Sequence, residues 1–116
     1  MSSHDARPAG AGLDLRTRIR IDLFLARRRA GMGAAAPRIL ALRERGRAAG
    51  MNTAEMLANE EGSSHEARAT ACLAFVAALL AQPGAPSPAA LRCMHDAGYG
   101  PDGIDAVIAR VRQETD

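Results

Sequence analysis

The chain has 116 residues, a formal net charge of +2 and an apolar fraction of 47%, with Phe24, Phe75 and Tyr99 as its only aromatic residues. This length accommodates one domain with a single modest core. The longest uncharged apolar run, residues 69–81, is shorter than the roughly 20 residues that span a bilayer, and residues 1–12 lack the apolar segment of a secretory signal. We therefore expect a cytoplasmic protein with one helical domain over residues 13–116, preceded by a disordered tail over residues 1–12.

All fifteen basic residues are arginines, and they are unevenly distributed. Residues 1–50 hold eleven arginines and four acidic residues, for a net charge of +7, whereas residues 51–116 hold four arginines and nine acidic residues, for −5. The basic half could face an anionic partner, could attract the acidic half, or could form the solvated faces of amphipathic helices. The residues predicted as a possible surface for an anionic partner are Arg27, Arg28, Arg29, Arg43, Arg45 and Arg47.

The first expected element covers residues 13–29. Its segment from Ile19 to Leu25 partly alternates between apolar and charged residues, which is typical of a strand. The spacing of Leu15, Ile19 and Leu23 fits a helix instead, the run is long for a strand, and the chain offers no partner strand. We predict a helix here, followed by a flexible link over residues 30–36.

The second and third expected helices cover residues 37–49 and 52–59. Pro37 suits the first position of a helix, and Gly46 should weaken that helix by about 1 kcal/mol relative to alanine. Gly50 is expected in the left-handed conformation that ends a helix, with Met51 as the apolar residue that packs against such an end. Asn52 and Glu55 have the spacing of a capping box.

The fourth expected helix, residues 63–82, is predicted to be the centre of the domain. Ser63 and Glu66 have the spacing of a second capping box, and Pro83 ends the run. Apolar residues, many of them alanine, cover most of its circumference, and such a helix is usually surrounded by other helices. Alanine offers little apolar area, so we expect part of this surface to be covered by self-association.

The last two expected helices begin at Ser87-Pro88 and at Pro101. Gly98-Tyr99 separates them in the same way that Gly50-Met51 separates the second and third helices, so a helical hairpin is used twice. The sequence therefore predicts an all-α fold, a small bundle of about six helices with a repeated hairpin.

Three segments carry a resemblance to a known family: LDLRTRIRIDLFLA (residues 13–26), RAAGMNTAEMLANEEGSSHEARATACLAFVAALL (residues 47–80) and PSPAALRCMHDAGYGPDGIDAVIARV (residues 86–111). Together they resemble the alkylhydroperoxidase and carboxymuconolactone decarboxylase family over about residues 13–112. The resemblance implies an alkylhydroperoxidase-like helical scaffold that assembles into homo-oligomers. In the peroxidase branch, a Cys-x-x-Cys pair, a following His and an upstream Glu perform the chemistry.

This sequence has replaced those reactive residues. The family motif can be aligned to this sequence in two ways, counting back from Ala49-Gly50 or forward from Leu13. The first alignment places the two cysteines and the histidine of the family at Ala35, Arg38 and Leu42, and the second places them at Gly31, Ala34 and Arg38. The glutamate falls at Ile19 or near Asp22, and neither alignment supplies a sulfur or an imidazole. We therefore predict no catalytic residue, no cofactor and no metal, and a role in protein interaction or small-ligand binding without peroxidase activity.

Two alternatives remain open at this stage. The first is an oxidoreductase with a relocated site that uses Cys93 or His95, or a site completed by a neighbouring subunit. Cys72 and Cys93 are expected to be buried, structural thiols. They should also be free, because they lie about 15 Å and about 8 Å along two antiparallel helices, and this offset, added to an interhelical distance of about 8–10 Å, exceeds the roughly 7 Å Cα limit for a disulfide. The second alternative is an arginine-rich nucleic-acid-binding module, which the lack of interleaved aromatic residues disfavours.

Overall fold

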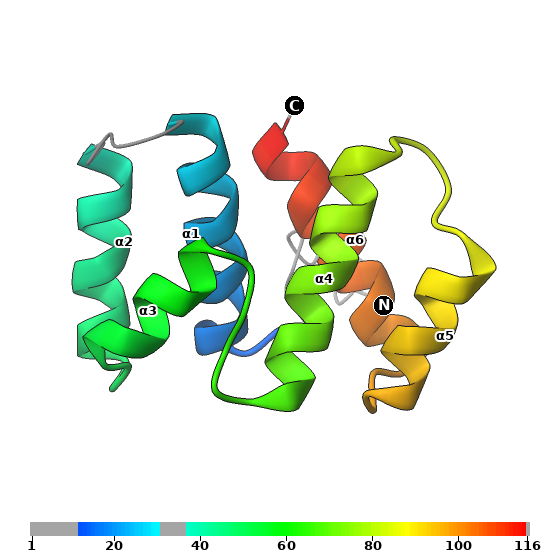
Figure 1. Cartoon of the computed structure of the whole chain (residues 1–116), viewed down its shortest axis with the longest axis horizontal. Coiled ribbons are helices and arrows are strands. Elements are labelled where there is room, and N and C mark those ends of the chain that lie inside the picture. The colour runs from blue at the N-terminus through cyan, green and yellow to red at the C-terminus, as the bar shows by residue number, and fades with distance from the viewer. Residues whose placement is uncertain (1–11, 31–36, 116) are drawn as a thin grey trace, which may run out of the picture.

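The computed structural model describes residues 12–30 and 37–115, and in these residues it contains six helices and no strand (Figure 1). This confirms the predicted all-α class. The helices are α1 (Leu15–Ala30), α2 (Pro37–Ala48), α3 (Thr53–Glu60), α4 (Ala67–Ala81), α5 (Pro88–Asp96) and α6 (Pro101–Thr115). The predicted tail, apart from residue 12, and the link at residues 31–36 lie outside the described residues. None of the helices in the described ranges combines the length and the apolar composition needed to cross a membrane.

The central helix of the bundle is α1, and the prediction that residues 63–82 form the centre was wrong. In Figure 1, α1 lies between the pair α2 and α3 on one side and the pair α4 and α6 on the other, and it packs against all four, while α5 packs on α4. Seven consecutive residues of α1, from Ile19 to Leu25, are buried, so this helix is enclosed on every side. By contrast, α4 leaves Ala74 and Ala78 exposed to solvent.

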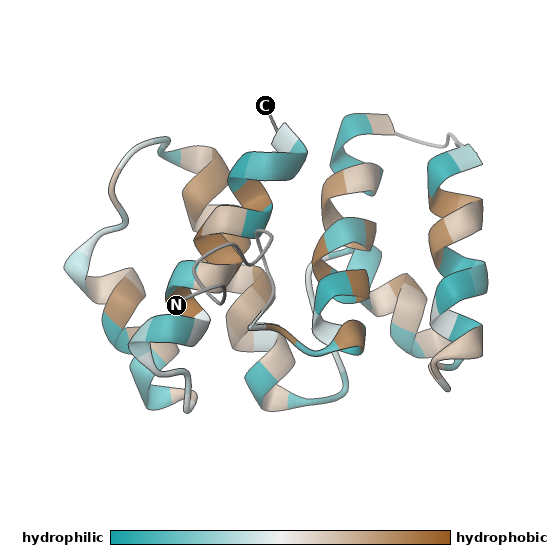
Figure 2. Ribbon diagram, turned by 180° about the vertical axis from the view of Figure 1, so that it is seen from behind, coloured by the Kyte–Doolittle hydropathy of each residue, from teal (hydrophilic) through white to brown (hydrophobic). Residues whose placement is uncertain are grey.

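The enclosed helix separates two apolar clusters. Ile19 and Leu23 face the smaller cluster, which α2, α3 and the turn between them complete with Ile39, Leu42, Met51 and Met56. Ile21, Phe24 and Leu25 face the larger cluster, to which α4, α5, α6 and the turn before α6 contribute Cys72, Leu73, Phe75, Val76, Met94, Tyr99, Ile104, Val107 and Val111. The alternating pattern that resembled a strand therefore reflects a helix that supplies apolar residues to two cores and charged residues between them (Figure 2).

The two predicted glycine turns are confirmed. Gly50 and Gly98 both have positive φ values, 87° and 102°. In each turn the amide of the following residue donates to a carbonyl five residues back, from Met51 to Gly46 at 2.9 Å and from Tyr99 to Met94 at 3.0 Å. Met51 and Tyr99 are both buried, as the apolar partner of this helix end should be.

The predicted helix starts are confirmed in two cases and wrong in one. The side chains of Asn52 and Ser87 accept hydrogen bonds from the third amide of α3 and α5. The capping box of Ser63 and Glu66 does not form: α4 begins at Ala67, and the Glu66 side chain makes no cap bond. Gly62, with a φ of 96°, ends α3, and the next residues turn back toward Glu55 instead of starting a helix.

We predict that Gly46→Ala destabilises the protein, although alanine is the better helix former. A Cβ atom at this position of α2 would lie 2.3 Å from the sulfur of Met56, which is 1% exposed on α3. The overpacking should cost about 1–3 kcal/mol and outweigh the gain in helix propensity of about 1 kcal/mol. The measurement is the free energy of unfolding in urea.

The matched control is Gly103→Ala in α6, where the nearest atom, in Tyr99, would lie 3.5 Å from the added Cβ. This variant should be neutral or more stable by up to about 1 kcal/mol. If Gly46→Ala were stabilised as much as Gly103→Ala, the close approach of α2 to α3 would be contradicted.

Candidate functional site

Two buried charges on α1 organise the polar interior. Arg20 and Asp22 are 8% and 2% exposed, and because they are two residues apart they face opposite sides of the helix. Arg20 donates to Glu55 on α3 at 3.1 Å and to Glu66 at 3.3 Å. Asp22 accepts two hydrogen bonds from the guanidinium of Arg110 on α6. A buried charge needs such a partner, so these pairs fix the rotation of α1 in the bundle.

The Asp22 side of α1 opens into a cavity of about 570 Å³ at one end of the bundle. The last turns of α1, α4 and α6 and the first turn of α2 meet at this end, at the top of Figure 1. The lining residues are Asp22, Leu25, Ala26, Arg28, Arg29, Ala30, Arg38, Leu80, Glu114 and Thr115. This volume lies in the usual range for small-molecule sites, about 300–1,000 Å³.

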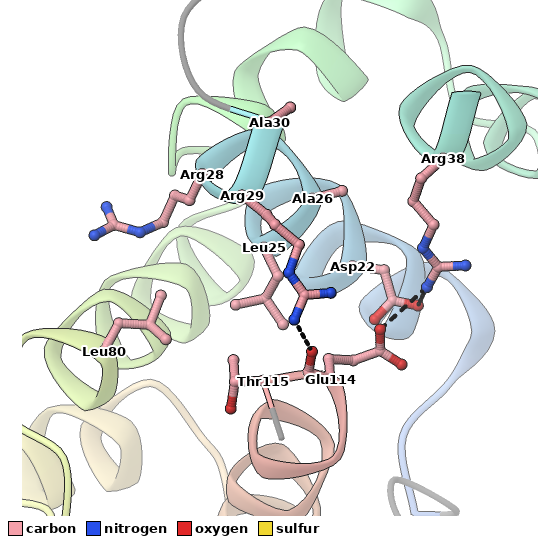
Figure 3. A pocket seen from close by; sticks show the side chains of 10 residues that line it. All are labelled: Asp22, Leu25, Ala26, Arg28, Arg29, Ala30, Arg38, Leu80, Glu114 and Thr115. Atoms are coloured by element: carbon pink, nitrogen blue, oxygen red, sulfur yellow. Dashed lines mark hydrogen bonds and ion pairs between the residues drawn. The ribbon is translucent and has the colours of Figure 1, made fainter. Parts of the chain in front are cut away.

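One wall of the cavity is a cluster of charged groups (Figure 3). Arg38 lies 3.2 Å from the carboxylate of Glu114 and 3.9 Å from that of Asp22. Arg29 donates to the backbone carbonyl of Glu114 at 3.0 Å. With Arg28 at the rim, three arginines and two acidic residues line the cavity, and Arg110 adds a fourth positive charge directly behind Asp22. The described groups therefore carry a positive excess.

The apolar lining comes from α1 and α4. Leu25 and Ala26 lie on the same face of α1 as Asp22 and Arg29, and Leu80 of α4 lies on the other side of Arg29 from Arg38 (Figure 3). The cavity is therefore lined by aliphatic residues and by charged residues, and the charged residues differ in how firmly they are held. Asp22 is fixed, since its side chain is 1% exposed, whereas the side chain of Arg38 is 51% exposed.

The arginines that were predicted as one anionic-partner surface lie in separate places. Arg27 and Arg43 both face the buried carboxylate of Glu60, which Arg43 binds through two hydrogen bonds of 2.8 Å. These bonds raise the pKa of Arg43. Arg47 pairs with Glu44 within α2.

The remaining three arginines of that set differ from one another. Arg28 and Arg29 line the cavity, and the Arg28 guanidinium lies 5.6 Å from the centre of the Phe24 ring. Arg45 is exposed on α2. The predicted surface therefore separates into internal ion pairs on the α2–α3 side and a pair of arginines at the cavity.

A second polar cluster surrounds Glu55 and serves the fold. Its carboxylate accepts hydrogen bonds from Arg20, the Asn59 amide, the Ser64 hydroxyl and the His65 amide. Burial alone would raise the pKa of Glu55, but these hydrogen bonds and the charge of Arg20 outweigh it and lower the pKa to about 2. A carboxylate held by this many donors is a structural anchor, and its oxygen atoms are already occupied.

Among the residues that the structure describes, the cysteine and histidine side chains do not form a common site. Cys72 is buried and Cys93 exposed, and both are free, so the prediction of two free thiols is confirmed and the prediction that both are buried was wrong for Cys93. Burial raises the pKa of Cys72 to about 11, which makes this thiol unreactive at neutral pH. His65 and His95 are exposed. Over the described ranges, no three His, Cys, Asp or Glu side chains are grouped as a metal site would require.

Comparison of the chain with models of protein families, with curated proteins and with solved structures finds no match.

The sequence analysis predicted Arg28 and Arg29 as possible contacts of an anionic partner but missed Arg38, Glu114, Arg110 and Leu80 as parts of a site. One signal was present, because an aspartate between Ile21 and Leu23 in an otherwise apolar stretch indicates a buried charge that needs a cation. The sequence does not indicate which cation pairs with this aspartate, since Arg110 is 88 residues away in the chain.

We predict that the stability of the protein falls between about pH 4.5 and pH 2, and that Glu55→Gln removes part of this dependence. The pKa of Glu55 is lowered on folding from 4.5 to about 2. Its ionised form therefore stabilises the fold above about pH 4.5, and this contribution, about 3 kcal/mol, is lost as the pH falls through about 2. The measurement is urea unfolding from pH 7 to pH 2.5.

The control is Glu44→Gln, since Glu44 is exposed on α2 and pairs with Arg47. This variant should keep the pH profile of the parent protein. A stability difference between the parent and Glu55→Gln that stays constant from pH 7 to pH 2.5 would contradict the assignment.

Proposed function

We propose that this chain binds a small anionic molecule in the cavity at the end of the bundle, between α1, α2, α4 and α6. The observation that carries this proposal is the cavity of about 570 Å³ that Arg29 and Arg38 line together with the aliphatic residues Leu25, Ala26 and Leu80. Guanidinium groups bind carboxylates and phosphates through planar, charge-assisted hydrogen bonds. An apolar wall beside them favours a ligand with an apolar part rather than a bare ion.

The ligand would bind by replacing Glu114 at Arg38. Glu114 occupies the position of an anion, since its carboxylate lies 3.2 Å from Arg38 while its side chain is 25% exposed. Because Arg38 is half exposed, this pair can open at small cost. Asp22 stays bound to Arg110 and keeps the cavity floor fixed.

The family resemblance supports the same location. Arg38 takes one of the reactive positions in both alignments, and Asp22 lies near the position of the glutamate. In this structure the two residues lie 3.9 Å apart and line the cavity together. We therefore propose a divergent alkylhydroperoxidase-like or carboxymuconolactone decarboxylase-like scaffold in which an ion pair has replaced the redox groups and ligand binding replaces peroxidase chemistry.

The alternatives have less support. Cys93 and His95 both lie on α5, and no residue of α5 lines the cavity. Nucleic-acid binding would need a continuous arginine face, but Arg27, Arg43 and Arg47 are engaged with acidic residues of the same chain. Self-association remains a prediction.

The test is the affinity for hexanoate, measured by titration calorimetry, with hexylammonium as the probe of opposite charge. We expect Arg38→Gln to weaken hexanoate binding by about fivefold to tenfold, because one charge-assisted hydrogen bond is lost. Glu114→Gln should strengthen binding severalfold, because it removes the carboxylate that competes for Arg38.

The control is Arg45→Gln, an exposed position on the same helix as Arg38 and outside the cavity lining. It should bind hexanoate like the parent protein. Preference for hexylammonium, or equal effects of Arg38→Gln and Arg45→Gln, would overturn the proposal.

A further inference from the structure

A second, apolar groove adjoins the cavity. It has a volume of about 380 Å³ and runs between the last turns of α4 and α6. Leu79, Ile108 and Val111 supply its aliphatic surface, and Arg112 lies at its rim. Leu80 and Thr115 line both spaces, so the groove and the cavity adjoin at these two residues.

The groove presents aliphatic surface that the fold has not buried. Leu79, Leu80 and Ile108 are only partly buried, although each packs at the edge of the larger core. An apolar chain laid along them would remove this surface from water at a gain that scales with its length. Binding of a narrow, apolar group in the groove would therefore be favourable.

The two spaces together define a direction. The cavity end carries Arg28, Arg29 and Arg38, whereas Arg112 is the one charged residue among the described residues that line the groove. Along α6, Ile108 and Thr115 are seven residues apart, which corresponds to about 10 Å. This distance suits an extended alkyl chain of about eight to ten carbons.

We propose that the ligand is a linear alkyl monocarboxylate, whose carboxylate binds Arg29 and Arg38 and whose chain passes Leu80 and Thr115 into the groove between α4 and α6. This inference rests on the proposed function and adds the identity of the ligand class. Charge complementarity selects this occupant over a second copy of the chain, because an apolar protein face would fill the groove and leave the arginines of the cavity unused.

The first experiment measures affinity along the series butyrate, hexanoate, octanoate and decanoate, each below its micellar concentration. We expect affinity to rise about threefold to fourfold per added methylene, the increment for burying one such group. Decan-1-ol should bind more weakly than decanoate, because it lacks the charge that Arg38 recognises. An affinity independent of chain length would overturn the inference and leave the proposed function standing, whereas no binding of any carboxylate would remove both.

The second experiment uses a large side chain to block the boundary between the cavity and the groove. Thr115 is exposed near the end of α6, and Thr115→Trp would place an indole between the two spaces. We expect this variant to lose at least tenfold in affinity for decanoate and to lose markedly less in affinity for butyrate, whose short chain stays in the cavity. The matched control is Leu57→Trp, at an exposed position on α3 that lines neither space, and it should behave like the parent with every ligand.

Two further outcomes would contradict the assignment. Arg112→Gln should weaken decanoate binding by less than Arg38→Gln does, so a loss as large as that of Arg38→Gln would reverse the direction of the ligand. Sedimentation of the protein with and without decanoate should give the same oligomeric state. A dimer that decanoate splits would identify a second copy as the normal occupant of the groove.

Discussion

The structure depends on placing two opposite charges inside one enclosed helix. Arg20 and Asp22 lie on the segment of α1 that is buried on every side, and each is held by a partner from another part of the chain, Glu55 and Arg110. Removing one partner from such a pair costs about 3–5 kcal/mol, because it leaves an uncompensated buried charge. Rotating α1 by one residue would break both pairs at once. The charges therefore specify how the two apolar clusters are joined.

The cavity is a consequence of that arrangement. With α1 fixed by Asp22 and Arg110, its last turn meets the last turns of α4 and α6 and the first turn of α2 at one end of the bundle. Helix ends carry unpaired backbone groups and polar side chains, so four of them cannot pack as tightly as four helix faces. Arg29 shows this directly, since it donates to a terminal carbonyl of α6. The polar wall arises from these helix ends, and the aliphatic wall from the edge of the larger core.

The sequence predicted the local features and missed those that depend on distant residues. Helix type, the Gly50 and Gly98 turns and two N-caps follow from neighbours within five positions, and these predictions are confirmed. The choice of α4 as the central helix was wrong because an apolar, alanine-rich surface was taken as a sign of enclosure, whereas a partner far along the chain allows a charged residue such as Asp22 to be buried. For the same reason Arg29 was predicted only as part of a basic surface, and the acidic and aliphatic residues that line the cavity with it were not predicted.

The most direct test is to locate the ligand by NMR, following the side-chain Nε resonances of arginine and the methyl resonances during titration with octanoate. We expect the resonances of Arg29 and Arg38 to shift together with those of Leu80 and Ile108. The resonances of Leu57 on α3 should stay unchanged. Shifts confined to other residues, or arginine shifts without any methyl shift in Leu80 and Ile108, would contradict this prediction.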